Sequence, residues 1–131
     1  MSREIKFRAW DGVLDRMCSW EEVRYVFSWI VNDKDYDLMQ FTGLRDKNGK
    51  EIYEGDIVCG SVSLVNGYDF ASDQETFDDE TFQSPITFNN GAFQAFINPW
   101  ESLLSLDEAV ANNIEFTVIG NIHESPELVT P

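Results

Sequence analysis

Lysine and arginine are missing from the larger, later part of this chain. All nine basic residues of the 131-residue sequence lie at or before Lys50, where acidic residues balance them. From Glu51 to Pro131 the charged residues are aspartate and glutamate only, so the formal net charge of −15 belongs entirely to this segment. Such a surface repels nucleic-acid phosphates and anionic membranes and attracts basic proteins. The charge distribution therefore predicts no direct nucleic-acid binding and favours a basic protein partner.

The sequence also lacks a recognisable targeting or membrane-spanning segment. Its N-terminus alternates charged and apolar residues, and no run approaches the about 20 apolar residues of a membrane helix. We therefore expect a cytoplasmic protein that makes no membrane contact. Only two cysteines are present, Cys18 and Cys59, and their spacing fits neither a metal site nor a redox pair. In that compartment we expect two reduced thiols.

Motifs that bind phosphate or zinc, or that present a catalytic serine, do not occur in the sequence. The acidic run at residues 33–37 resembles the start of a calcium loop, but Leu38 and Leu44 stand where that loop needs glycine and glutamate, which favours a solvated loop. His123 is the single histidine, and we predict that it caps a strand end. A role as general base or lone metal ligand beside nearby carboxylates stays open. We predict no catalytic residue, no metal and no cofactor, and hence a protein that is not an enzyme.

Strand-forming and aromatic residues are what the sequence has in quantity. It is 43% hydrophobic and 14% aromatic, enough to build a folded core without metals or disulfides. Alternation over residues 4–10 predicts a strand with one buried face, and residues 13–19 follow as its hairpin partner. Residues 20–30 show both the Ser19–Glu22 spacing of a helix capping box and an alternation of β-forming side chains; we favour a strand. Trp10, Trp20, Trp29 and Trp100 are predicted to lie in the core or in an interface.

Turn signals divide the rest of the chain into hairpins. Asn48-Gly49 is typical of a tight turn between residues 41–45 and 50–53, with Asp46 bonding forward into it. Asn66-Gly67 predicts a second turn, into residues 68–70. A third turn at residues 89–91 separates residues 85–88 from residues 92–97.

The C-terminal part holds the best helix signal. Ser105 and Glu108 form a capping box in a helix predicted within residues 102–113. A closing strand is predicted at residues 115–122, with Gly120 in a bulge or a close backbone approach. Ser125 and Pro126 suit the start of one final helical turn.

Together these elements predict a single domain, residues 1–131, of the mainly β class (β-rich α+β). Its N-terminal β-hairpin region spans residues 1–40. A barrel-like region, 41–131, is built from hairpins as a small SH3-like or related barrel, with one short helix before the last strand. The turn at Gly55-Asp56 leads into Ile57-Val58 and resembles the turn that starts a strand in SH3-like barrels.

Three blocks carry a more specific signal. They are IKFRAWD at residues 5–11, FTGLRDKNGKEIYEGDIV at 41–58 and VIGNIHESPEL at 118–128. In composition and order they resemble the YopX family of phage and prophage proteins. The resemblance implies a phage or prophage accessory protein, but it brings no biochemical activity and no catalytic residues. The glycines and apolar residues of the blocks are those that turns and buried strands require.

The segment at about residues 68–84 falls outside these blocks and is predicted to be an acidic insertion, with residues 71–84 an exposed loop or a short frayed helix. We expect it to bind a partner through the carboxylates of Asp69, Asp73, Glu75, Asp78, Asp79 and Glu80. The leading hypothesis is a non-enzymatic protein-binding module that also forms a homo-oligomer. One alternative is an acidic DNA mimic that inhibits a host DNA-binding protein, and another is a small ligand-binding or enzymatic barrel that uses His123.

Overall fold

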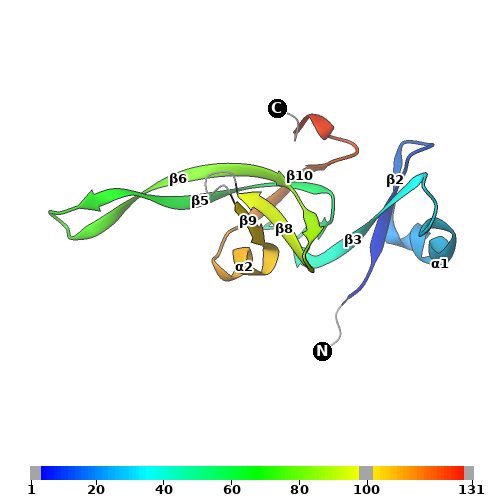
Figure 1. Cartoon of the computed structure of the whole chain (residues 1–131), viewed down its shortest axis with the longest axis horizontal. Helices are drawn as coiled ribbons and strands as arrows, with labels where there is room; N and C mark the ends of the chain where they lie inside the picture. Colours follow the sequence, from blue (N-terminus) through cyan, green and yellow to red (C-terminus); the bar gives the residue numbers. More distant parts are fainter. Residues whose placement is uncertain (1–3, 98–101, 129–131) are drawn as a thin grey trace.

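The computed structural model describes residues 4–97 and 102–128. An N-terminal sheet has the order β2-β1-β3-β4, formed by β1 (Phe7–Asp11), β2 (Arg16–Cys18), β3 (Tyr36–Arg45) and β4 (Glu51–Tyr53). Helix α1 (Trp20–Ile30) packs on this sheet at one end of the molecule (Figure 1). Its small core contains Ala9, Cys18, Val23 and Ile30.

Two further antiparallel sheets form the main body. One has the order β10-β5-β6, from β5 (Asp56–Asp69), β6 (Gln74–Pro85) and β10 (Phe116–Asn121). The other has the order β7-β8-β9, from β7 (Thr87–Asn89), β8 (Ala92–Ile97) and β9 (Ser102–Ser105). Helix α2 (Leu106–Ala111) follows β9, and a short 3₁₀ helix, η2 (Pro126–Leu128), follows β10.

The larger hydrophobic core lies between these two sheets and α2. In β8 every second residue, Phe93, Ala95 and Ile97, is buried in this core, as in a sheet with one buried face. The curled antiparallel sheets form a half-barrel, which confirms the mainly β class. The helix before the last strand is also confirmed as α2, whose N-cap Ser105 accepts a hydrogen bond from the Glu108 N–H at 3.2 Å.

Several predicted turns are present. Gly49 (φ +84°) and Gly55 (φ +87°) adopt the left-handed conformation at the two ends of β4, although Asn48 does not. Asn90 and Gly91 both have positive φ and join β7 to β8. A register shift in β10 lies between Val118 and Gly120, so the predicted bulge is confirmed.

Residues 20–30 were predicted as a strand, and that prediction is wrong. They form α1, because Val23 and Ile30 lie on one helical face and are buried against the N-terminal sheet. The alternation that favoured a strand included Tyr25 and Trp29, which are 76% and 78% exposed. The alternating residues therefore do not form one buried face.

The two predictions for the acidic segment are also wrong. Asn66-Gly67 is a bulge inside β5, not a turn, and the chain reverses at residues 70–73 instead. Residues 74–85 form strand β6, neither a loop nor a helix. β6 pairs with β5 along its whole length, from Ile57–Pro85 to Asp69–Gln74, and the resulting ribbon leaves the body as a long projection (Figure 1). Backbone pairing over this length overrides the weak strand propensity of Asp and Glu.

Candidate functional site

The three sequence blocks meet in space at a junction between the sheets. Arg8, from the first block, donates to Asp56 Oδ1 at 2.9 Å and lies over the ring of Tyr53 at 4.8 Å. Asp56 is 2% exposed and also accepts the Tyr53 N–H at 2.8 Å. Burial raises the pKa of Asp56, and the nearby Arg8 partly offsets this effect. This buried ion pair fixes β1 against the turn that begins β5.

Asp46 connects the second block to the third. Its carboxylate accepts the N–H groups of Asn48 and Lys50 at 2.9 Å each within the turn, and that of Val118 in β10 at 3.0 Å. Burial alone would raise the pKa of Asp46, but these three donors lower it below the usual aspartate value. The turn is thereby fixed to a strand 72 positions away along the chain.

His123 lies at the end of β10, as expected for a histidine that caps a strand end. Its Nε2 is 2.6 Å from Asp37 Oδ2, and its ring stacks on Trp10 with centroids 5.0 Å apart and an interplanar angle of 6°. The structure thus ties the third block to β1 and β3. Beside this contact is a cleft of about 260 Å³, lined by Asp37, Glu54 and apolar residues. Burial, with a smaller contribution from Asp37, raises the pKa of Glu54.

The calcium-like run at residues 33–37 begins with a turn, in which Asp33 Oδ1 accepts the Asp35 N–H at 2.9 Å, and its end enters β3. Across residues 4–97 and 102–128, no group of three or more His, Cys, Asp or Glu side chains is arranged to hold a metal ion.

Cys18 is buried and Cys59 half-buried, and both are free thiols. Within the described residues, no helix is long and apolar enough to cross a membrane.

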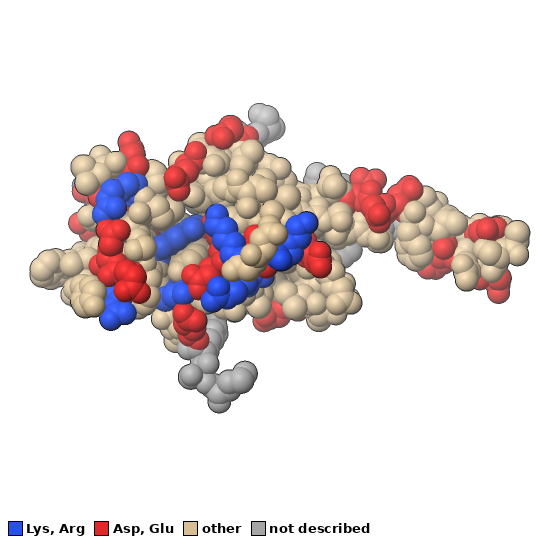
Figure 2. All heavy atoms as spheres, turned by 180° about the vertical axis from the view of Figure 1, so that it is seen from behind, with Lys and Arg blue, Asp and Glu red and all other residues tan. Residues whose placement is uncertain are grey.

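The ribbon of β5 and β6 contains the whole predicted acidic site. We call residues 63–80 the arm, because they lie beyond Val62 and Phe82, the last buried residues of β5 and β6 on the way to the tip. Every side chain described in the arm is exposed. Figure 2 shows the arm with acidic side chains and no basic ones, while lysine and arginine gather on the body.

The strand register gives the arm two different faces, because directly opposed residues of an antiparallel pair share a face. One face carries Val65 opposite Phe77, and Tyr68 opposite Glu75. Phe70 at the tip packs edge-on against Tyr68 at 4.9 Å. We call this the apolar face; the exposed fractions of its large side chains are 57% for Val65, 43% for Tyr68, 87% for Phe70 and 56% for Phe77.

The six predicted acidic residues do not share one surface. Asp69 accepts the Ala71 N–H at 3.0 Å and the Ser72 hydroxyl at 2.9 Å, so it stabilises the turn at the tip. Asp73 contacts the Tyr68 hydroxyl in the same turn. The other four lie on β6. Glu75 and Asp79 are on the apolar face, whereas Asp78 and Glu80 are on the opposite face, which we call the acidic face.

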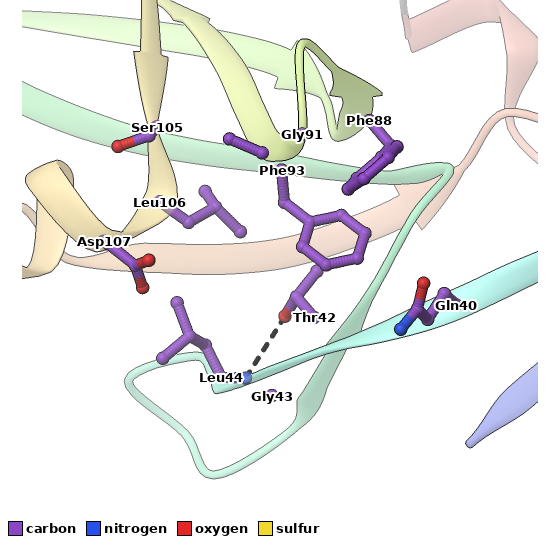
Figure 3. A pocket seen from close by; sticks show the side chains of 11 residues that line it. Gln40, Thr42, Gly43, Leu44, Phe88, Gly91, Phe93, Ser105, Leu106 and Asp107 are labelled. Atoms are coloured by element: carbon purple, nitrogen blue, oxygen red, sulfur yellow. Dashed lines mark hydrogen bonds between the residues drawn. The ribbon is translucent and has the colours of Figure 1, made fainter. Parts of the chain in front are cut away.

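Sequence reasoning missed a groove on the body. Its volume is about 560 Å³, and it lies between β3, the β7–β8 hairpin and the start of α2 (Figure 3). Phe88 and Phe93 on one side and Leu44 and Leu106 on the others give it apolar walls. The lining comes from three distant segments, each with an ordinary strand or helix pattern, so no local signal in the sequence could have indicated the groove.

Of the four tryptophans, Trp29 is exposed, Trp10 and Trp20 are half-buried, and Trp100 lies outside the described residues.

A family model described as YopX protein matches residues 24–130. The chain belongs to the YopX family. The resemblance carried by the sequence blocks is therefore confirmed, although the opening block lies before the matched residues.

Solved structures of other proteins have the same fold. Protein EF1440 from Enterococcus faecalis superimposes with a TM-score of 0.59 and 24% identity, covering 98% of this chain and all of that one. Protein yopX from Bacillus subtilis gives a TM-score of 0.56 and 19% identity, covering 95% of this chain and 98% of that one. No curated protein matches the sequence at a significant level. At these identities the likeness extends to the fold alone.

Proposed function

We propose that this YopX-family chain is a non-enzymatic phage or prophage accessory protein, acting in the cytoplasm, that binds another protein through its arm. The observation that carries the proposal is the exposure of both faces of the arm, one of which displays Val65, Tyr68, Phe70 and Phe77. Aromatic residues that project together on a defined backbone are typical anchors of protein interfaces.

The energetics of the arm support this proposal. A two-stranded hairpin on its own is at best marginally stable in water, because neither face is covered. The arm is such a hairpin beyond Val62, and it leaves its apolar face in solvent. A partner that covers this face removes apolar surface from water and stabilises the ribbon at the same time. We therefore infer that a binding partner covers the ribbon when the protein functions.

Charge indicates the chemistry of the partner. The arm contains six carboxylates and no lysine or arginine. A partner surface with basic residues around an apolar patch fits both features, whereas nucleic acid and anionic membranes are repelled. Because the carboxylates are exposed, their contribution is screened by salt, and we expect binding to weaken as ionic strength rises.

Affinity capture from a host-cell extract tests the proposal. The wild-type chain is compared with a double variant, Phe70→Ser and Phe77→Ser, and with a control, Tyr25→Ser, which removes another exposed aromatic residue from α1 at the other end of the molecule. We expect the arm variant to lose a basic partner that the wild type and the control retain. Equal capture by all three chains would contradict a role for the arm.

The DNA-mimic alternative is less well supported by the geometry. Imitation of a phosphate backbone needs carboxylates in a row on one face, but β6 divides Glu75 and Asp79 from Asp78 and Glu80. Aromatic side chains occupy much of the face that carries the first pair. Competition between this protein and DNA for a basic DNA-binding protein tests the alternative, and undiminished DNA binding would contradict it.

The ligand-binding or enzymatic alternative requires a cleft beside His123. The cleft of about 260 Å³ is lined by Glu54 and by Asp37, the carboxylate that His123 contacts, but His123 is not among its lining residues. His123 already stacks on Trp10 and contacts Asp37, so its ring is held as a structural bridge would hold it. His123→Phe distinguishes the two roles: a change confined to stability favours the bridge, whereas lost binding of a small ligand with unchanged stability favours a site.

A further inference from the structure

The arm and the groove are complementary surfaces on one chain. Leu44, Phe88, Phe93 and Leu106 give the groove apolar walls, polar residues that include Asp107 complete its lining, and it opens to solvent (Figure 3). Phe88 is 51% exposed and packs on Phe93 with ring centroids 5.0 Å apart, so an aromatic surface is available at the opening. A volume of about 560 Å³ falls within the range of about 300–1,000 Å³ that binding pockets usually have. It can receive large side chains from outside.

A basic stretch adjoins the groove. β3 lines the groove as far as Leu44 and continues directly into residues 45–50, which we call the basic turn. Arg45, Lys47 and Lys50 are exposed there, whereas Asp46 is buried and bonded to backbone N–H groups. Arg45 contacts Glu51 at 3.4 Å, but the side chains of Lys47 and Lys50 form no ion pair with any residue that the structure describes. The basic turn therefore presents two exposed lysines outside any ion pair of the described residues, although Lys50 is near enough to Asp46 to contribute to its lowered pKa.

The arm has the opposite pattern. Its tip carries Tyr68 and Phe70 in edge-on contact, a pair of rings suited to an apolar pocket of this size. Behind the tip, Glu75 and Asp79 lie on the same face as these rings, without an ion pair among the described residues. An aromatic tip followed by carboxylates matches a groove with apolar walls that is bordered by lysines.

We propose that the arm of one copy of this chain docks in the groove of a second copy, with Tyr68 and Phe70 in the groove and Glu75 and Asp79, on the same face of the arm, toward Lys47 and Lys50. The arm projects away from the body, so the partner groove belongs to another molecule (Figure 1). A second copy carries such a groove and is present wherever the chain is made. The inference rests on the proposed function, because it names the occupant of the same arm.

This contact joins two different surfaces, and it is therefore a heterologous, head-to-tail contact. Each molecule retains a free arm or a free groove until the assembly closes into a ring or extends as a filament. An arm-to-arm contact, by contrast, joins identical surfaces and stops at a dimer. Variants that disable one surface at a time distinguish these two arrangements.

Sedimentation velocity of the full chain tests the proposal with three variants. Phe70→Ser disables the arm, the double substitution Lys47→Glu and Lys50→Glu disables the basic turn, and Lys34→Glu makes the same kind of charge change in the exposed turn after α1 as a control. We expect the wild type and the Lys34 variant to self-associate. Loss of a central aromatic anchor should weaken the contact about 30-fold or more, leaving the arm variant monomeric.

Mixing the two disabled variants gives the decisive result. The arm variant still has a groove and the turn variant still has an arm, so an equimolar mixture should form a one-to-one dimer and nothing larger. Circular dichroism establishes that each variant is folded. A monomeric wild type, or a turn variant that associates as the wild type does, would overturn the inference. If a monomeric wild type still captures a basic protein through Phe70, the proposed function stands and only the identity of the partner is wrong.

Discussion

Replacing Asp46 by alanine should separate two parts of the chain that are distant in sequence. The Asp46 carboxylate is the acceptor for the N–H groups of Asn48, Lys50 and Val118, and the residue is only 8% exposed. Alanine has no acceptor, so these donors lose their partner together. The loss affects both the turn between β3 and β4 and the attachment of that turn to β10.

The expected cost follows from the number and kind of these bonds. A hydrogen bond to a charged group contributes about 1.5–3 kcal/mol, but donors near the surface, such as Asn48 N–H, regain water when the carboxylate is removed. We therefore expect Asp46→Ala to lower the free energy of unfolding by about 3 kcal/mol and Asp46→Asn, which keeps one oxygen, by roughly half as much. Urea unfolding at pH 7 measures both values. A loss below about 0.5 kcal/mol for alanine, the usual effect of a surface substitution, would refute this account of the junction.

The same residue predicts a dependence on pH. Folding lowers the pKa of Asp46, so its contribution to stability is present above the unfolded value of about 3.9 and is lost as the pH falls through the folded value. Asp46→Asn removes this titration. The difference in stability between the wild type and the variant should therefore shrink as the pH is lowered below about 4. A difference that stays constant from pH 7 to pH 2 would contradict the assignment.

Three further predictions concern other positions. Arg8→Ala leaves the Asp56 carboxylate buried without its cation and should cost about 3–5 kcal/mol in urea unfolding; a neutral result would show that the pair is dispensable. Gly60→Ala places a Cβ 2.6 Å from the backbone oxygen of Glu115, so it should lower the free energy of unfolding by about 1–3 kcal/mol. An unchanged free energy of unfolding would show that β5 and the segment before β10 separate at no cost. Glu54→Gln should raise thermal stability at pH 7 but not at pH 4: burial raises the pKa of Glu54, so its stabilising protonated form is lost as the pH rises through the folded value. A variant less stable than the wild type at pH 7 would contradict this sign.

The parts of the fold that the sequence predicted correctly are those with local signals. The positive φ of Gly55, the capping bond of Ser105 and the bulge before Gly120 each follow from a residue and its near neighbours. Helix α1 shows where such signals compete. Ser19 is the N-cap that the capping-box spacing indicated, although its side chain makes no capping bond, and the alternating β-formers were misleading because every second one is solvent-exposed.

The arm shows why the site was predicted only in part. Its carboxylates were identified, but a segment rich in Asp and Glu has low strand propensity, so the sequence favoured a loop. Its strand structure comes from pairing with β5, a tertiary property. The division of Asp78 and Asp79 onto opposite faces, and the gathering of Val65 and Phe77 on one face, depend on that register, which no local pattern specifies.

Hydrogen–deuterium exchange tests the central claim, that the arm is the binding element, most directly. The chain is measured at a concentration low enough to be monomeric, and again in the complex purified by capture or self-association. In the free chain the amides of residues 63–80 should exchange far faster than those of the buried part of β5, because a ribbon uncovered on both faces opens easily. In the complex those arm amides should gain the largest protection in the molecule. Unchanged exchange in the arm, with protection elsewhere on the body, would contradict the account.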